Sequence, residues 1–250
     1  MLKLMKYEFR KQAFSKLVIL ALIALFEIVF FYGVIRDNQN TIATVIGLLT
    51  VFTIGALFFL AFESIITYSN DLKQKCSYML FLTPNTSYSI VGAKVLSAGI
   101  QIILAGAAFF ALFVFDAGVL IARYDKLANF KKAFLQFLDQ FYNIQIDFSD
   151  LVATVCYIIA LWIFIITLAF FSITLSTTFL ANKKYKGIVS FIIFMVSNYL
   201  YSKISNLILD GRPGMGDVSI LLTWQTVITV VFILLAYFGT AWMLEKKVSV

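Results

Sequence analysis

The chain has 250 residues, of which 62% are hydrophobic and 13% are charged, and its mean hydropathy is +0.94. This composition is far more apolar than that of a soluble domain, and runs long enough to span a bilayer consume nearly the whole length. A formal net charge of +7 raises the question of nucleic-acid binding. The lysines and arginines lie in short clusters between apolar runs, where they favour anionic lipid headgroups, so no nucleic-acid partner is expected.

Few residue types that carry chemistry are present. Histidine is absent, which removes the commonest general base and transition-metal ligand. The two cysteines, Cys76 and Cys156, have no metal-binding spacing, and the G-x-x-x-x-G-K-[ST] pattern of a phosphate-binding loop occurs nowhere. We therefore expect this chain to be no enzyme, with no catalytic residue, no metal site and no cofactor of its own.

The first segment, residues 1–16, is basic and amphipathic (MLKLMKYEFRKQAFSK). It has the charged flank of a signal peptide, but the apolar run that follows is longer than a signal sequence and lacks an A-x-A exit. We expect a retained N-terminal helix that lies in the interface at the cytoplasmic surface.

Six apolar runs of about 20 residues follow, each long enough to cross the hydrocarbon as a helix. The runs are continuous and do not alternate as barrel strands do, so helices are favoured. The expected spans are residues 17–35, 42–68, 90–115, 151–180, 187–208 and 218–244. The predicted fold is an all-α membrane protein with a six-transmembrane-helix bundle in one domain, residues 1–250.

The distribution of lysine and arginine predicts that both termini are cytoplasmic. In this orientation the inner group has 13 members and the outer group has 7. The inner group is Lys3, Lys6, Arg10, Lys11, Lys16, Lys73, Lys75, Lys94, Lys183, Lys184, Lys186, Lys246 and Lys247. The outer group is Arg36, Arg123, Lys126, Lys131, Lys132, Lys203 and Arg212.

The segment 123–150, between the third and fourth spans, is an expected outer amphipathic helix. Its apolar residues recur at steps of three and four: Leu127, Phe130, Phe134, Phe137, Leu138 and Phe141. Such a helix lies in the membrane interface, either as an anchor or lid on the bundle or as a platform that guides an amphipathic substrate. Its basic group would face the cytoplasm if one apolar run were re-entrant.

The loop 69–88, between the second and third spans, has an informative order of residues. Asp71 opens a short amphipathic segment, Thr83 and Pro84 close it, and Lys94 follows ten residues after the proline. This order resembles the cytoplasmic coupling loop of the permease subunits of ABC-2 type transporters, in which a Glu usually stands at the place of Asp71. The basic N-terminal helix and the six spans resemble the same family plan.

The chain also departs from the family pattern. Lys75 and Cys76 occupy the places of a common Gly-Thr pair, and Ser87 replaces a frequent Arg. These departures bear on the subfamily more than on the family.

The resemblance implies that the loop docks on a separate ATP-binding subunit, which holds the ATP and Mg²⁺. Docking needs apolar anchors and polar rim contacts. The expected coupling residues are Asp71, Leu72, Lys73, Gln74, Lys75, Tyr78, Met79, Leu80, Phe81, Thr83 and Pro84. The alternative is an ordinary amphipathic loop helix that lies on the membrane.

The family further implies two permease chains, a homodimer in preference to a heterodimer, in a bacterial cytoplasmic membrane. The small size resembles exporters of toxin or antimicrobial peptides, such as lantibiotics and phenol-soluble modulins. The leading hypothesis is an ATP-driven exporter of amphipathic or hydrophobic peptides that works by alternating access. Export of lipid or glycolipid, a proton-coupled carrier without an ATPase, and a passive membrane scaffold are the alternatives.

Polar residues inside the spans are the candidates for a substrate path. Glu27 lies near the middle of the first span, where a carboxylate must be paired or neutral, or must face a wet path. Thr167, Thr174 and Thr178 fall on one face of the fourth span. They could line a path, although such hydroxyls more often bond to their own backbone four residues back.

Overall fold

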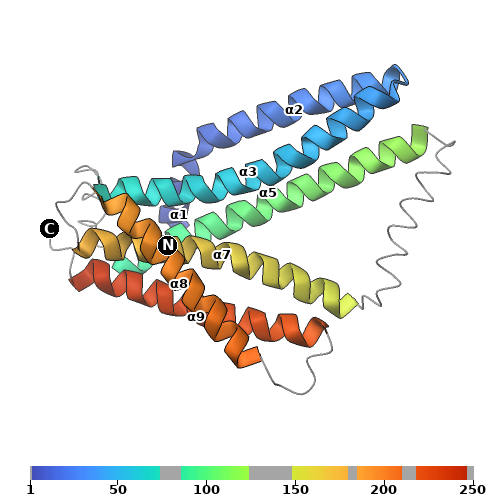
Figure 1. Ribbon diagram of the computed structural model, residues 1–250. Helices are drawn as coiled ribbons and strands as arrows, with labels where there is room; N and C mark the ends of the chain where they lie inside the picture. The colour runs from blue at the N-terminus through green and yellow to red at the C-terminus, as the bar shows by residue number, and fades with distance from the viewer. Residues whose placement is uncertain (1, 74–85, 124–147, 180–184, 210–217, 247–250) are drawn as a thin grey trace. The chain divides into compact units, whose positions relative to one another are not determined.

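The computed structural model describes residues 2–73, 86–123, 148–179, 185–209 and 218–246. All regular structure in these residues is helical (Figure 1). The helices are α1 (Leu2–Lys11), α2 (Ala13–Ile35), α3 (Gln39–Lys73), α5 (Ser87–Arg123), α7 (Phe148–Phe179), α8 (Lys186–Leu209) and α9 (Val218–Lys246).

Every helix in the described residues except α1 is long and apolar enough to cross a bilayer. The expected all-α fold with six spans is therefore confirmed, and the architecture is that of a multi-pass membrane protein. The predicted outer amphipathic helix falls mostly on residues 124–147, which lie outside the described residues.

Several of the expected boundaries differ from the observed ones. Helix α3 continues to Lys73 and α5 begins at Ser87, so both ends of the expected loop 69–88 are helical. Helix α5 also runs about two turns beyond the expected end of the third span, as far as Arg123. Asp71 and Asp116 lie shortly after the expected ends at residues 68 and 115, and both helices continue past them.

The chain divides into two compact units. The first unit contains residues 1–9, 61–100 and 148–250, and the second contains residues 10–60 and 101–147. Helices α3 and α5 each contribute to both units, with the division after Leu60 in α3 and after Ile100 in α5.

The core of the first unit forms where α8 and α9 pack on α7. Phe164 of α7 and Tyr201 of α8 are buried, and their ring centroids are 4.3 Å apart. The Tyr201 hydroxyl lies 2.7 Å from Thr229 Oγ1 of α9, which satisfies both groups inside the core. One aromatic side chain thus joins all three helices.

The second unit is built on the hairpin of α2 and α3. Asp37 adopts a left-handed φ of 53°, and the N–H of Asn38 donates to the carbonyl of Gly33 over 3.1 Å. This pattern is a Schellman end, which satisfies the last carbonyls of α2. The side chain of Asn38 then caps α3, because its Oδ1 accepts the N–H of Thr41 over 3.3 Å.

Gly33 permits the close approach of the two helices at this turn. A Cβ at this position would lie 3.2 Å from Ile42 Cγ1, which is tighter than ordinary contact. The apolar core of the unit lies next to this point and contains Phe30, Val34, Ile42, Val45 and Leu120.

We expect Gly33→Val to destabilise the protein by about 1–3 kcal/mol, because the added atoms overpack the contact with Ile42. The matched control is Gly47→Val in α3, since a Cβ at Gly47 would meet nothing within 4 Å. Thermal unfolding in detergent measures both variants. Equal melting temperatures for the two would contradict the close packing at Gly33.

Candidate functional site

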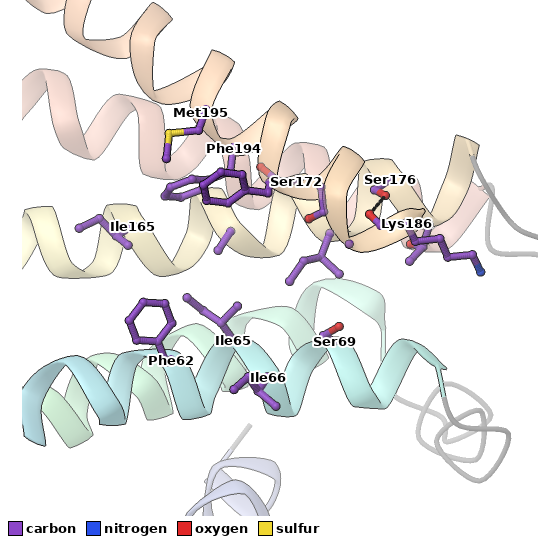
Figure 2. Close-up of a pocket in the computed structure, with 16 residues that line it drawn as sticks. Phe62, Ile65, Ile66, Ser69, Ile165, Ser172, Ser176, Lys186, Phe194 and Met195 are labelled. Carbon is purple, nitrogen blue, oxygen red and sulfur yellow. Dashed lines mark hydrogen bonds between the residues drawn. The ribbon is translucent and has the colours of Figure 1, made fainter. Parts of the chain in front are cut away.

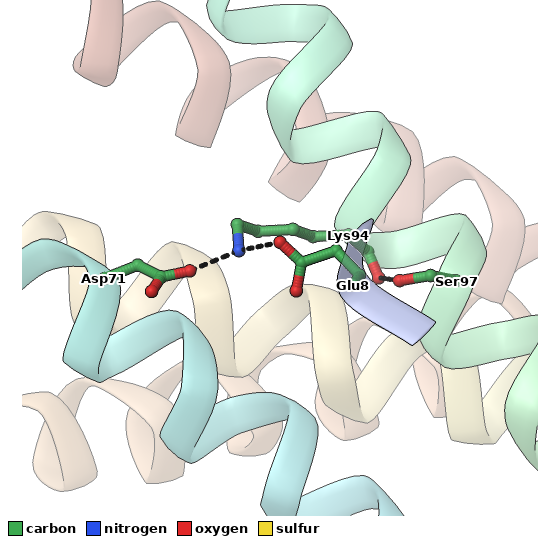
Figure 3. A network of polar contacts seen from close by, with 4 residues as sticks. All are labelled: Glu8, Asp71, Lys94 and Ser97. Carbon is green, nitrogen blue, oxygen red and sulfur yellow. Dashed lines mark hydrogen bonds and ion pairs between the residues drawn. The ribbon is translucent and has the colours of Figure 1, made fainter. Parts of the chain in front are cut away.

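The ammonium group of Lys94 lies between two carboxylates in the first unit (Figure 3). Lys94 Nζ donates to Glu8 Oε1 over 2.6 Å and to Asp71 Oδ2 over 2.5 Å. All three residues are buried, with exposed fractions of 4% for Glu8, 7% for Asp71 and 5% for Lys94. We call Glu8, Asp71 and Lys94 the ion triad.

The ion triad joins three helices that are separate in the sequence. Glu8 lies in the amphipathic α1, Asp71 lies in the last turn of α3, and Lys94 lies about two turns after the start of α5. The backbone carbonyl of Lys94 also accepts a hydrogen bond from Ser97 Oγ over 2.9 Å. The ion pair of Asp71 and Lys94 therefore connects the end of α3 with the N-terminal part of α5.

Burial makes the three charges depend on one another. Taking an ion out of water costs several kcal/mol, and only a close opposite charge with good hydrogen-bond geometry offsets this cost. Glu8 and Asp71 both accept from the ammonium group of Lys94, so the two acids share this lysine. The triad can hold the three helices together, because each carboxyl group is bound to the same ammonium group.

The expected coupling residues begin at this triad. The carboxylate of Asp71, which the sequence placed at the rim of a protein contact, is instead buried against Lys94. Leu72 is half-buried in α3, and Lys73 is the last residue of that helix. The other expected coupling residues, Gln74, Lys75, Tyr78, Met79, Leu80, Phe81, Thr83 and Pro84, lie outside the described residues.

The threonines expected to line a substrate path lie in α7 and bond to its backbone. Thr167 Oγ1 donates to the carbonyl of Ile163 over 2.9 Å, and Thr174 Oγ1 has the carbonyl of Phe170 at 2.9 Å. Thr178 Oγ1 donates to the carbonyl of Thr174 over 2.8 Å. Thr167 and Thr174 are 1% and 0% exposed, so these hydroxyls match the backbone-bonded alternative.

Thr174 also holds α3 against α7. The hydroxyl of Tyr68 lies 2.5 Å from Thr174 Oγ1, and the Tyr68 ring stacks on Phe170 with centroids 4.1 Å apart. Tyr68 is 1% exposed and lies three residues before Asp71 in α3. This contact ties the end of α3 that carries Asp71 to the helix at the centre of the first unit.

Glu27, the remaining candidate for a substrate path, lies in α2 within the second unit. Its carboxyl group lies close to that of Asp116 in α5. The expected third span ended at residue 115, just before Asp116. Helix α5 continues past Asp116, so the two acids meet between α2 and α5. The spacing of residues within a single helix could not indicate this pair.

Sequence reasoning missed Glu8 as a partner of Lys94. One signal was available, because Glu8 is the only acidic residue of α1 (LKLMKYEFRK). It lies one helical turn after Leu4, on the side of the helix that is not exposed. An acid on the buried side of a basic amphipathic helix indicates a buried cation, although the spacing does not say which one.

Comparisons with known proteins give no match, whether with protein families, characterised proteins or solved structures. Among the described residues, no group of three or more His, Cys, Asp or Glu side chains could hold a metal ion. Function must therefore be inferred from the order of the residues and from their contacts.

We expect Lys94→Met to destabilise the protein by about 3–5 kcal/mol, because two buried carboxylates lose their common partner. The control is Lys6→Met, which removes an exposed lysine of α1. Combining Lys94→Met with Glu8→Gln and Asp71→Asn should restore most of the lost stability. Thermal unfolding in detergent measures the stability of each variant. Equal melting temperatures for Lys94→Met and Lys6→Met would contradict a structural role for the triad.

Removal of the Tyr68 hydroxyl tests the contact between α3 and α7. Tyr68→Phe keeps the stacking on Phe170 and should cost about 0.5–1.5 kcal/mol, the net worth of a hydrogen bond. In a double-mutant cycle with Thr174→Val, the two effects should not add. Tyr185→Phe, at a position that is 67% exposed, is the control. Full additivity would show that the hydroxyls do not interact.

Proposed function

We propose that this chain is the membrane-spanning permease subunit of an ATP-driven exporter of the ABC-2 type. It lies in a bacterial cytoplasmic membrane with both termini on the cytoplasmic side. The observation that carries the proposal is the ion triad, which joins α1, α3 and α5 at the base of segment 74–85. In the sequence, that segment holds most of the residues expected to contact an ATPase.

The triad gives the proposed coupling a physical basis. A force on segment 74–85 reaches α3 through its last residue, Lys73, and α5 through its first turn at Ser87. Because Asp71 and Lys94 form a buried ion pair, the two helix ends move together and do not separate. The ion pair between Glu8 and Lys94 makes α1 move together with these helix ends.

The movement passes from α3 to the rest of the first unit. Tyr68 bonds to Thr174 and stacks on Phe170, both in α7, and α7 packs against α8 and α9. Packed cores switch between discrete arrangements and do not deform continuously, so such a connected set of helices can rock as one body. Alternating access requires motion of this kind.

Asp71 acts in this proposal as a positioning residue that holds the end of α3. The docking contacts with the ATPase come from Leu72 and from the apolar side chains of segment 74–85. The ATP-binding partner supplies ATP, Mg²⁺ and all covalent chemistry, and this chain supplies the mechanical response. Two permease chains, as a homodimer, assemble with two ATP-binding subunits.

The proposed substrate is an amphipathic or hydrophobic peptide of the toxin or antimicrobial kind, with a lipid or glycolipid as the alternative. The small permease without a large outer domain resembles peptide exporters.

The first experiment is purification of the tagged chain in mild detergent, with mass spectrometry and an ATPase assay of what copurifies. We expect an ATPase with a phosphate-binding loop in a stoichiometric amount. The double variant Leu72→Asp, Phe81→Asp should lose it, because charges replace the apolar anchors.

The control for this experiment is Thr86→Asp, which adds charge close to the same segment. Thr86 Oγ1 caps α5 by accepting the N–H of Ser89 over 3.3 Å, and aspartate caps a helix equally well. The control should keep the ATPase bound. Retention by the double variant, or recovery of the wild-type chain alone under several gentle conditions, would contradict the proposal.

One observation favours a second candidate, a proton-coupled carrier without an ATPase. The carboxyl groups of Glu27 and Asp116 lie close together, and the repulsion between two neighbouring carboxylates favours a proton on one of them. Such a pair inside two membrane helices can take up and release a proton. Proton flux into vesicles that contain this chain alone, abolished by Glu27→Gln, would favour the carrier over the exporter.

A further inference from the structure

An apolar cavity of about 520 Å³ lies within the first unit, between α3, α7 and α8 (Figure 2). Its size falls within the range of about 300–1,000 Å³ that is typical of ligand pockets. None of the coupling or substrate-path residues discussed above lines it. The proposed function therefore leaves this cavity unused.

The cavity has one apolar end and one polar end. Phe62, Ile165 and Met195 lie at the apolar end, and Ser69, Ser176 and Lys186 lie at the other end (Figure 2). The polar end coincides with the end of a span, since Lys186 is the first residue of α8. The hydroxyl of Ser176 donates to the backbone carbonyl of Lys186 over 2.7 Å, which fixes the start of α8 beside the cavity.

The apolar rim of the cavity faces outward from the helices. Phe62, Ile66 and Phe191 line the cavity and are 58%, 57% and 59% exposed. All three belong to candidate membrane spans, where the surrounding medium is hydrocarbon. A ligand can therefore enter from the side, out of the bilayer.

We propose that this cavity binds one acyl chain of an anionic membrane lipid, with the phosphate of the headgroup at Lys186. The apolar lining accommodates the acyl chain, and Lys186, a half-buried residue at the end of its span, attracts the negative charge of the headgroup. The site goes beyond the proposed function, because it belongs to this chain alone and requires no ATPase.

The apolar lining favours an acyl chain over an extended peptide. Phe62 and Ser69, at opposite ends of the cavity, are seven residues apart in α3, so the cavity is about 10 Å long. An extended peptide would fit, but it would leave backbone groups unsatisfied against the apolar wall.

The test uses the full chain in phosphatidylcholine vesicles that contain a trace of phosphatidylglycerol with a photoreactive group on one acyl chain. After irradiation, mass spectrometry locates the labelled residues. We expect labelling to concentrate on the cavity-facing residues of α3, α7 and α8. Unlabelled phosphatidylglycerol should compete about fivefold better than additional phosphatidylcholine, as expected for one lysine near an anionic surface.

Two variants separate the roles of the chain and the headgroup. Ser190→Trp fills the cavity and should reduce labelling about tenfold, while Ser202→Trp, at an exposed position on the same helix outside the cavity, should not. Lys186→Gln should remove the preference for phosphatidylglycerol and keep the labelling. Its control is Lys203→Gln, which removes a lysine that lies over the Tyr199 ring, away from the cavity.

Lys186→Gln removes one charge at a half-buried position and adds no bulk, so it tests the site even if Ser190→Trp fails to fold. An unchanged preference for phosphatidylglycerol in Lys186→Gln would overturn the headgroup assignment. Labelling spread evenly over all spans, or unchanged by Ser190→Trp in a folded protein, would overturn the site itself. Displacement of the lipid by an amphipathic helical peptide, but not by phosphatidylglycerol, would assign the cavity to a peptide.

Discussion

The buried ammonium group of Lys94 is the constraint on which the first unit depends. Water cannot reach it, so carboxylates must replace the lost hydration, and they come from two other helices, at Glu8 and Asp71. The two acids would repel each other without the lysine between them. The positions of α1 and of the adjoining ends of α3 and α5 thus follow from the solvation of one cation.

The spans were predictable from the sequence because lipid imposes a strict rule. Every backbone group in the bilayer must bond within its own helix, so long apolar runs have one solution. The ends of the spans were less predictable, and the errors occur at acidic residues. The expected spans end at residues 68 and 115, shortly before Asp71 and Asp116. Each of these carboxyl groups lies against a residue of another helix, and the helices continue to Lys73 and Arg123.

The candidate site was predictable only in part, for a related reason. The order of acid, proline and lysine singled out Asp71 and Lys94, but a linear pattern does not state that two residues 23 positions apart touch. Helical periodicity placed Thr167 and Thr174 on one face of α7. It did not predict whether their hydroxyls bond to water or to the backbone carbonyls that they contact in the structure. The lipid cavity left no pattern at all, because it arises from the space between three helices.

The sequence separation within the ion triad has a consequence for how the protein is made. Glu8 and Lys94 are 86 residues apart. At about 5–20 residues per second, a ribosome needs roughly 4–17 s to synthesise that interval. During this time α1 is without its cation, and Glu8 remains hydrated at the membrane surface. The triad closes only after the third span enters the bilayer, so the N-terminal helix reaches its final position late in membrane insertion, although it is synthesised first.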